Sequence, residues 1–302
     1  MDKRFLNYPE WQDTADTLHL FLQMAGKVKV ERGYKRPEWG HVRMYLTIQG
    51  IGTGIIPAQD RNFEIYFNLV HHHVDVQDSL GNRTRIPLGD GLSVADFHGQ
   101  LMGALDYIGT PTPINPVPQE FHDPTPFDQD TQHRSYDRAA VELFLANLHF
   151  AHRSLTGFLA PMRGKTDMPA FWFGTMDLSG IVYSGQPAPY SGSDMIGRNA
   201  FDEKFCEFGF WPGDTKIPDP SFYALPYPFL ASIGSYGTLL APEKAQFLTQ
   251  ESEFLFSLED AFSAPDPQQA VGEFFRSTFT ILQRLDRWDD LEWITEPLTY
   301  RK

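Results

Sequence analysis

The first hydrophobic pattern of the chain is helical, and it begins after Trp11-Gln12-Asp13-Thr14, a sequence typical of a helix cap. Apolar residues then recur at the helical spacing, at Leu18, Phe21, Leu22 and Ala25. The pattern predicts a helix from about Ala15 to about Gly26, with a strand after Gly26-Lys27.

Three polar residues of this helix, His19, Gln23 and Lys27, are spaced four apart, so their side chains form a stripe beside the apolar face. A polar stripe is usually the solvent-facing side of a helix, and we expect that here. The alternative is that the imidazole, the amide and the amine supply functional groups.

The pattern then changes to alternation, which is typical of strands with one buried face. Residues 41–50 alternate first, and Phe63–Leu69 follow as a second strand. The apolar parity switches after Leu69, which either a hairpin tip or a bulge near residues 71–73 explains. Further strands near residues 74–77 and 84–88 complete an antiparallel meander.

A second helix follows the meander. Ser93 and Asp96 resemble a capping box, an apolar stripe runs from Val94 to Ile108, and Gly109 ends the helix. The first half of the chain is therefore predicted as helix, four strands and helix.

Residues 110–137 are rich in proline and polar residues, which excludes an ordinary helix or central strand. We interpret them as the connector between two halves. The connector carries more titratable groups than a spacer needs, although loops also collect such groups for solubility. These groups are His122, Asp123, Asp128, Asp130, His133, Tyr136 and Asp137.

The second half repeats the order of elements. A long helix capped by Asp137 is followed by predicted strands and a closing helix capped by Asp266. The predicted strands are Ala170–Tyr183, Phe205–Phe210, Phe222–Tyr227 and Glu253–Leu258. Leu155–Lys165 also echoes Thr17–Lys27, since both segments end in Gly-Lys before a strand.

This order predicts an α+β protein of two related halves, each an antiparallel meander flanked by helices. The halves form either one compact pseudo-symmetric unit or two docked domains, and the sequence leaves both open. We place the domain boundary between residues 123 and 124, which gives domains 1–123 and 124–302. The echo of the first helix favours an internal repeat.

Charge and composition restrict the partners. The formal net charge is −14 with a pI near 5.1, which disfavours nucleic acid and anionic membranes. No apolar run is long enough to cross a bilayer, and the first residues lack the apolar core of a signal peptide. Cys206 is the single cysteine, so no intrachain disulfide forms and a cytoplasmic location is predicted. We expect Cys206 to be packed rather than nucleophilic.

Common cofactor and hydrolase signatures are absent: the chain contains no GxGxxG after a strand, no GxxxxGK[ST], no GxSxG and no HExxH. The cofactor therefore stays unknown. His71 and His73 would point the same way on a strand, within chelating reach. Asp75 shares their face, but no further histidine motif follows, so we predict no metal site and keep His71 and His73 as the alternative.

Acid and base candidates come from several elements. Glu207 lies in an aromatic segment, where burial would raise its pKa unless the carboxylate is paired. The simpler interpretation is a structural carboxylate bonded to the backbone or to a lysine such as Lys27 or Lys165. The candidate catalytic residues are His19, Lys27, His133, Asp177 and Glu207. The candidate ligand-binding residues are Gln23, His41, Tyr136, Trp172 and Trp211.

The abundance of aromatic residues, 14% of the chain, favours a lined cavity. We therefore predict a small-molecule enzyme with an acid/base site in an aromatic-lined pocket between the halves. The alternative is a non-catalytic protein that binds a small molecule or another protein. The sequence indicates neither the substrate nor the oligomeric state.

Three segments, TLHLFLQMAGK, PTPFDQDTQHRSYD and CEFGFWPGD, together resemble a bacterial family known only as a domain of unknown function. The resemblance extends from Trp11 to about Trp288. It implies no catalytic residues, and the His71-His72-His73 run is not part of it.

Overall fold

The computed structural model describes residues 4–286, 288 and 291–296. The chain divides into two compact units. The first contains Met1–His149 and Phe171–Asp177, and the second contains Phe150–Ala170 and Leu178–Lys302. Two six-stranded antiparallel sheets with flanking helices confirm the predicted α+β class. The boundary between residues 123 and 124 concerns independently folding domains and stays a prediction.

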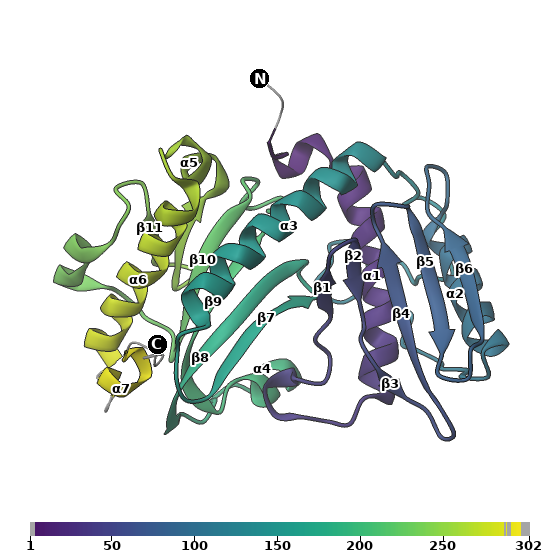
Figure 1. Cartoon of the computed structure of the whole chain (residues 1–302), viewed down its shortest axis with the longest axis horizontal. Coiled ribbons are helices and arrows are strands. Elements are labelled where there is room, and N and C mark those ends of the chain that lie inside the picture. The colour runs from purple at the N-terminus through teal and green to yellow at the C-terminus, as the bar shows by residue number, and fades with distance from the viewer. Residues whose placement is uncertain (1–3, 287, 289–290, 297–302) are drawn as a thin grey trace, which may run out of the picture. The chain divides into compact units, whose positions relative to one another are not determined.

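The first unit contains the helices α1 and α2, the beginning of the long helix at residues 138–159, and one sheet in the strand order β1-β2-β4-β5-β6, with β3 paired to β4 (Figure 1). Its elements are α1 (Gln12–Arg32), β1 (Tyr45–Thr47), β2 (Gly50–Gly52), β3 (Ile56–Pro57), β4 (Asn62–Asn68), β5 (His73–Asp78), β6 (Arg83–Pro87) and α2 (Val94–Tyr107). The predicted second, third and fourth strands correspond to β4, β5 and β6.

Helix α1 is longer than predicted, because Gly26 does not end it. The helix continues to Arg32, and the N–H of Gly33 donates to the carbonyl of Lys29 at its end. Gly26 instead lies against the ring of Phe173, where a Cβ atom would be only 2.1 Å from ring carbons. The glycine therefore permits a close approach of helix and ring.

Aromatic contacts join α1 and α2 to the sheet of the first unit. The rings of Phe21 on α1 and Phe97 on α2 are stacked at 4.2 Å, and Phe67 on β4 lies 6.1 Å from Phe97. All three side chains are buried. This cluster fixes α1 and α2 on the sheet.

The single strand predicted for residues 41–50 is wrong. The chain reverses at Ile48-Gln49, so that β1 and β2 form a short hairpin, and Ile48 is 88% exposed. A Cβ atom on Gly50 would lie 1.9 Å from the carbonyl oxygen of Phe67, so β2 pairs with β4 at a distance that only glycine allows here.

Three other predictions for the first unit are confirmed: a hairpin tip, a helix cap and a connector without regular structure. The hairpin tip at residues 71–73 is confirmed, and His72 has a φ of 51° there. Ser93 caps α2, since its hydroxyl accepts from the N–H of Asp96 at 3.1 Å. The connector contains no helix or strand, as predicted.

Asp137 caps the next helix, α3 (Arg138–Leu159), by accepting from the N–H of Ala139 at 2.9 Å. The predicted strand Ala170–Tyr183 is two strands, because the chain turns at residues 173–176. Phe171, Trp172 and Asp177, beside this turn, belong to the first unit.

The second sheet has the order β11-β12-β10-β9-β8-β7. Its strands are β7 (Thr166–Trp172), β8 (Asp177–Pro187), β9 (Glu203–Trp211), β10 (Ser221–Tyr227), β11 (Gln246–Leu248) and β12 (Glu253–Ser257). The accompanying helices are α4 (Met195–Ala200), α5 (Leu258–Ser263), α6 (Pro267–Asp286) and α7 (Leu291–Thr295).

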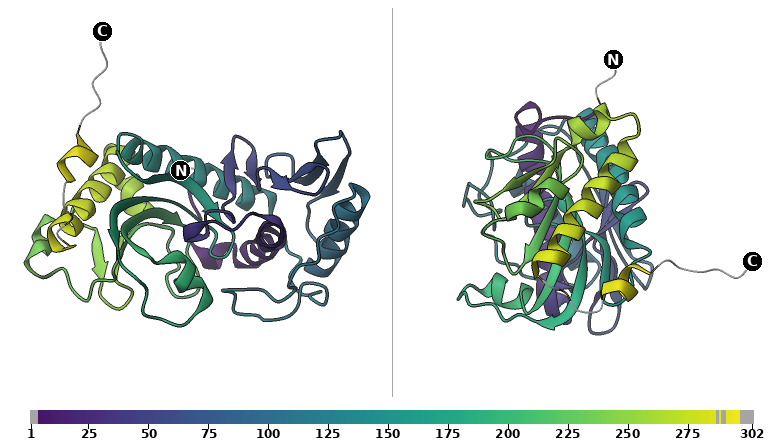
Figure 2. Two further views of the ribbon diagram at one scale, coloured as in Figure 1. Left: turned by 90° about the horizontal axis from the view of Figure 1, so that it is seen from below. Right: turned by 90° about the vertical axis from the view of Figure 1, so that its left-hand side faces the viewer.

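Figure 2 shows α6 lying across one face of this sheet. Phe275 on α6 and Phe158 on α3 both contact Phe208 of β9, with ring centroids 5.4 and 4.7 Å apart. Cys206 is buried in the same strand, and burial raises the pKa of its thiol well above the usual value. This supports a packed rather than a nucleophilic cysteine.

The two Gly-Lys pairs have different conformations. Gly26-Lys27 is helical, whereas Gly164, with a φ of 82°, lies in the loop before β7. The internal repeat therefore stays a prediction. None of the helices in the described part of the chain is long and apolar enough to span a membrane.

Candidate functional site

The polar stripe of α1 is covered by the connector. Gln23 is fully buried, its amide N–H donates to the carbonyl of Gln119 at 2.8 Å, and its amide oxygen accepts from the N–H of Gln119 at 3.0 Å. Lys27 is 7% exposed and donates to the carbonyl of Val117 at 2.8 Å. The expectation of a solvent-facing stripe is therefore wrong.

Lys27 also lies over the ring of Phe127, with Nζ 5.6 Å from the ring centroid. Burial lowers the pKa of Lys27, and the nearby Glu31 opposes that shift. The amine thus binds the connector through a backbone carbonyl and an aromatic face.

His19 faces the turn at residues 173–176. Its Nε2 lies 3.0 Å from the carbonyl oxygens of both Phe173 and Gly174, and since carbonyls only accept, Nε2 carries the hydrogen. Burial lowers the pKa of His19 to about 4, against the effect of these two bonds. His19 is neutral at pH 7, and its ring meets Phe121 edge-on at 5.5 Å.

Residues 130–137 of the connector are held by the starts of α1 and α2. The N–H of Val94 donates to the carbonyl of His133 at 3.0 Å, and the N–H of Ala95 donates to that of Asp130 at 2.9 Å. At α1, the hydroxyl of Thr14 accepts from the N–H of Asp137 at 3.0 Å. The N–H groups at the start of α2, which have no acceptor within the helix itself, thereby fix the main chain at Asp130 and His133.

Asp130 orients the His133 ring. Nδ1 of His133 lies 2.6 Å from Oδ2 of Asp130, and the other carboxylate oxygen accepts from the N–H groups of Gln132 and His133 at 3.0 and 3.1 Å. Because a carboxylate accepts, Nδ1 carries the hydrogen, and neutral His133 has its lone pair on Nε2.

His133 also belongs to a cluster with Asp16 and His122. One ligand-type atom from each of the three side chains lies within 4.8 Å of the other two. Asp16 is buried, His133 is half-buried and His122 is exposed. The ring of Phe121 contacts both histidines: its centroid lies 4.5 Å from the ring centroid of His122 and 5.6 Å from that of His133.

The charge of Asp16 is poorly compensated. Burial raises the pKa of its carboxyl, and a hydrogen bond from the Tyr8 hydroxyl and the two histidines oppose the shift. Among the described residues, no lysine or arginine forms an ion pair with Asp16. A cation at this cluster would offset the cost of burying the carboxylate.

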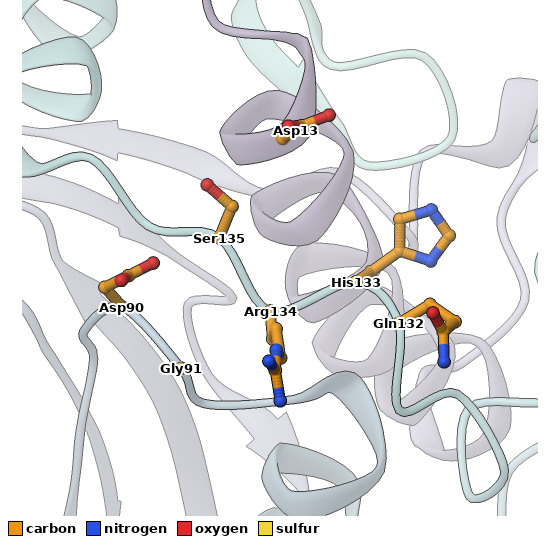
Figure 3. Close-up of a pocket in the computed structure, with 7 residues that line it drawn as sticks. All are labelled: Asp13, Asp90, Gly91, Gln132, His133, Arg134 and Ser135. Carbon is orange, nitrogen blue, oxygen red and sulfur yellow. The ribbon is translucent and has the colours of Figure 1, made fainter.

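A pocket of about 580 Å³ borders this cluster, because His133 is one of its lining residues. Figure 3 shows the residues that line the pocket. Its lining is polar and comes from the start of α1, the turn before α2 and the connector. The lining residues are Asp13, Asp90, Gly91, Gln132, His133, Arg134 and Ser135. Groups that donate, accept and carry charge of both signs therefore face one space.

Several predicted site residues of the first unit lie outside this cluster. Tyr136 is buried with its hydroxyl 3.2 Å from Nδ1 of His72, and burial raises its pKa. Nδ1 of His41 accepts from the N–H of Arg36 at 3.2 Å, and burial lowers its pKa. The guanidinium of Arg43 lies 5.4 Å from the ring centroid of Trp172.

The remaining predicted carboxylates accept hydrogen bonds from hydroxyls. Asp177 accepts from Thr175 in the first unit. Glu207 and Trp211 belong to the second unit, where Glu207 accepts from Ser179 at 2.5 Å and from Tyr223 at 3.0 Å. Two hydroxyls are therefore among the partners of Glu207, and its catalytic role stays a hypothesis.

The histidine hairpin has its own partners. The rings of His71 and His73 are stacked at 6.4 Å, and Nε2 of His73 lies 3.2 Å from Asp75. Asp75 also accepts from Arg83 and Arg85, which hold its pKa at about 2 although burial opposes them. These arginines already compensate the carboxylate that a metal would need.

Of the residues in and beside this cluster, only His133 was a predicted site residue, and Asp16, His122 and Asp130 were not. His122 and Asp130 were visible as titratable residues of the connector. The signal for Asp16 was weaker. Asp16 lies about one turn before His19 on the same face of α1, which places the two side chains near each other.

The fold and the site together define an α+β protein with two antiparallel sheets and a cluster of histidine and carboxylate side chains in its first unit. The chain belongs to DUF5996, a family of unknown function, which matches residues 5–294. Family membership confirms the resemblance, while the bacterial origin and the motifs stay predictions. No curated protein and no solved structure matches the chain.

Proposed function

We propose that the first unit carries the reaction site of a small-molecule enzyme, at the pocket beside His133. The hydrogen bond of 2.6 Å between Asp130 and His133 carries this proposal, because it places an oriented imidazole on the pocket wall. A carboxylate that holds one ring nitrogen leaves the other free to take up a proton or to bind a Lewis acid.

The pocket has the size of a small-molecule site, and its lining residues are polar. Its volume of about 580 Å³ lies within the range of roughly 300–1,000 Å³ that such sites occupy. Asp13, Asp90 and Arg134 place charges of both signs around it. We therefore infer a polar substrate that carries hydrogen-bonding groups.

The other predicted acid and base groups have different proposed roles. His19 and Lys27 bind backbone carbonyls, so they position the turn at residues 173–176 and the connector. Asp177 and Glu207 remain candidates for acid/base work, to be tested by Asp177→Asn and Glu207→Gln.

A non-catalytic binding protein is the second candidate. It is supported by the polar stripe of α1, in which His19, Gln23 and Lys27 all bind main-chain groups of other segments. In that case the pocket holds a ligand without changing it.

The test is a thermal-shift screen of polar metabolites, followed by calorimetry on the compounds that stabilise the protein. Mass spectrometry of each bound compound after incubation separates an enzyme, which converts it, from a binder, which does not. The decisive variant is His133→Gln, and His98→Gln on α2 is the matched control.

We expect His133→Gln to lower turnover by roughly 10²- to 10⁴-fold, the usual contribution of a general acid or base, and His98→Gln to leave it unchanged. Equal binding and equal turnover in the wild type and in His133→Gln would contradict the proposal. Binding that depends on His133 without conversion would favour the second candidate.

A further inference from the structure

We propose that Asp16, His122 and His133 bind a divalent transition-metal ion, and that Zn²⁺ fits this donor set best. The three side chains already converge, with their ligand-type atoms within 4.8 Å of one another. The inference rests on the proposed function for its location, because His133 belongs both to the cluster and to the pocket.

The donor set selects the class of metal. Two imidazole nitrogens and one carboxylate oxygen suit zinc and neighbouring transition metals, whereas Mg²⁺ and Ca²⁺ prefer oxygen ligands. Three protein ligands with an open position are also the usual arrangement of a catalytic rather than a structural zinc site.

The surroundings of His133 are those of a metal ligand. Its Nδ1 donates to Asp130 at 2.6 Å, so Nε2 is the nitrogen available to the ion. A histidine that binds zinc commonly gives its other N–H to a carboxylate, which fixes the ring and makes the ligand more basic. Asp130 is itself buried and held by two backbone N–H groups.

Asp16 is the second built element of the site. Its side chain is buried and held by the Tyr8 hydroxyl, and no lysine or arginine among the described residues neutralises it. A divalent ion would supply that charge. The same need is absent at the histidine hairpin, where Arg83 and Arg85 already pair with Asp75.

Closing the site requires a small movement. Donor atoms around tetrahedral zinc lie about 3.3 Å apart, so separations of up to 4.8 Å must shorten by roughly 1 to 1.5 Å. His122 is exposed and lies on the connector, which has no helix or strand there. Its imidazole can move toward the two more enclosed ligands, and its exposure gives the ion a path from solvent.

Metal binding would change the chemistry of the pocket. The lone pair of His133 would then bind the ion, and a metal-bound water, whose pKa falls to about 7 on zinc, would become the acid/base group. His133 in this case is a ligand and Asp130 a positioning residue.

The test uses the full chain, purified without a histidine tag, stripped by a chelator and titrated with Zn²⁺ and with Co²⁺. Elemental analysis gives the stoichiometry, competition with a chelating dye gives the affinity, and the visible spectrum of Co²⁺ reports the geometry. We expect one ion per chain. We also expect a visible spectrum that is typical of Co²⁺ with a low coordination number.

Variants separate this cluster from other histidines. His122→Ala and His133→Ala should weaken Zn²⁺ binding by more than about 100-fold, since loss of an outer partner alone usually costs 10- to 100-fold. Asp130→Asn should fall within that lower range and keep the Co²⁺ spectrum. The double variant His71→Ala/His73→Ala is the matched control and should bind like the wild type.

The proposal is overturned if the wild type binds neither ion stoichiometrically, if His122→Ala binds as tightly as the wild type, or if the control variant loses the ion. His122 is exposed, so its substitution tests the site even if Asp16→Asn fails to fold. A metal-free protein whose ligand binding still depends on His133 would overturn this inference and leave the proposed function standing.

Discussion

The backbone of Gly26 and the ring of Phe173 are so close that a Cβ atom on Gly26 would lie 2.1 Å from two ring carbons. We predict that Gly26→Ala destabilises the protein by about 2 to 4 kcal/mol, because the ring must move out of a close-packed position. The free energy of unfolding in urea measures this loss.

Gly103 is the matched control, since it lies inside α2 and a Cβ atom there meets nothing within 4 Å. Gly103→Ala should stabilise the protein by about 0.5 to 1 kcal/mol through helix propensity. If both alanines change stability alike, the ring of Phe173 does not restrict Gly26.

A second prediction concerns Gln23, which satisfies both main-chain groups of Gln119. Gln23→Leu should cost about 2 to 3 kcal/mol, because it leaves the N–H and the carbonyl of Gln119 without their partner. Limited proteolysis should then cut within residues 110–137 faster than in the wild type. Gln100→Leu, at an exposed position of α2, is the control and should leave the cleavage rate unchanged.

A third prediction concerns acid stability through His19. The pKa of His19 is about 4 in the folded chain and 6.5 in the unfolded chain, because burial disfavours the imidazolium. The unfolded chain therefore binds the proton first as the pH falls, and stability present above pH 6.5 is lost progressively toward pH 4.

The wild type should lose about 1 to 2 kcal/mol more than His19→Gln between pH 7.5 and pH 5. Denaturant unfolding at both pH values measures the difference, and parallel losses in the two proteins would refute it. Glutamine keeps an N–H donor for the carbonyls of Phe173 and Gly174, so the variant removes mainly the titration.

A fourth prediction concerns Lys29, a buried residue of α1 that donates to the carbonyls of Arg43 and Thr53, the latter at 2.7 Å. Burial lowers its pKa from 10.5 to about 8, and the positive charges of Arg36 and Arg43 add to the shift. Between these values the folded chain releases the proton while the unfolded chain keeps it, so stability rises with pH.

Relative to Lys29→Met, the wild type should gain about 2 to 3 kcal/mol between pH 7 and pH 10. The methionine variant shares every other titrating group, so it serves as the baseline of the comparison. A constant difference between the two proteins over this range would show that Lys29 keeps an ordinary pKa.

The sequence predicted elements whose signals are local. Ser93 caps α2 through its own hydroxyl, and the alternation of Phe63–Leu69 directly reports one buried face of β4. The reversal at Ile48-Gln49 escaped prediction because the alternation continues across it, and only the close approach of Gly50 to Phe67 reveals the turn.

The candidate site was predictable only in part for a similar reason. His133 stood out in a connector rich in titratable groups, whereas Asp16 resembles an ordinary polar residue of the first turns of a helix. Its burial comes from Tyr8 and from residues more than 100 positions away, and no periodicity along α1 encodes such contacts.

The hydrogen bonds that join α1 to Val117 and Gln119 of the connector run from side chains of the helix to main-chain groups of these two residues. Contacts of this kind depend on the path of the backbone and are indifferent to the side chain that each position carries. Substitutions of Val117 or Gln119 by most residues should therefore be tolerated, while a single deletion between them would shift the register of every bond. For the hydrogen bonds between α1 and residues 117–119, the number of residues in the segment therefore matters more than their identity.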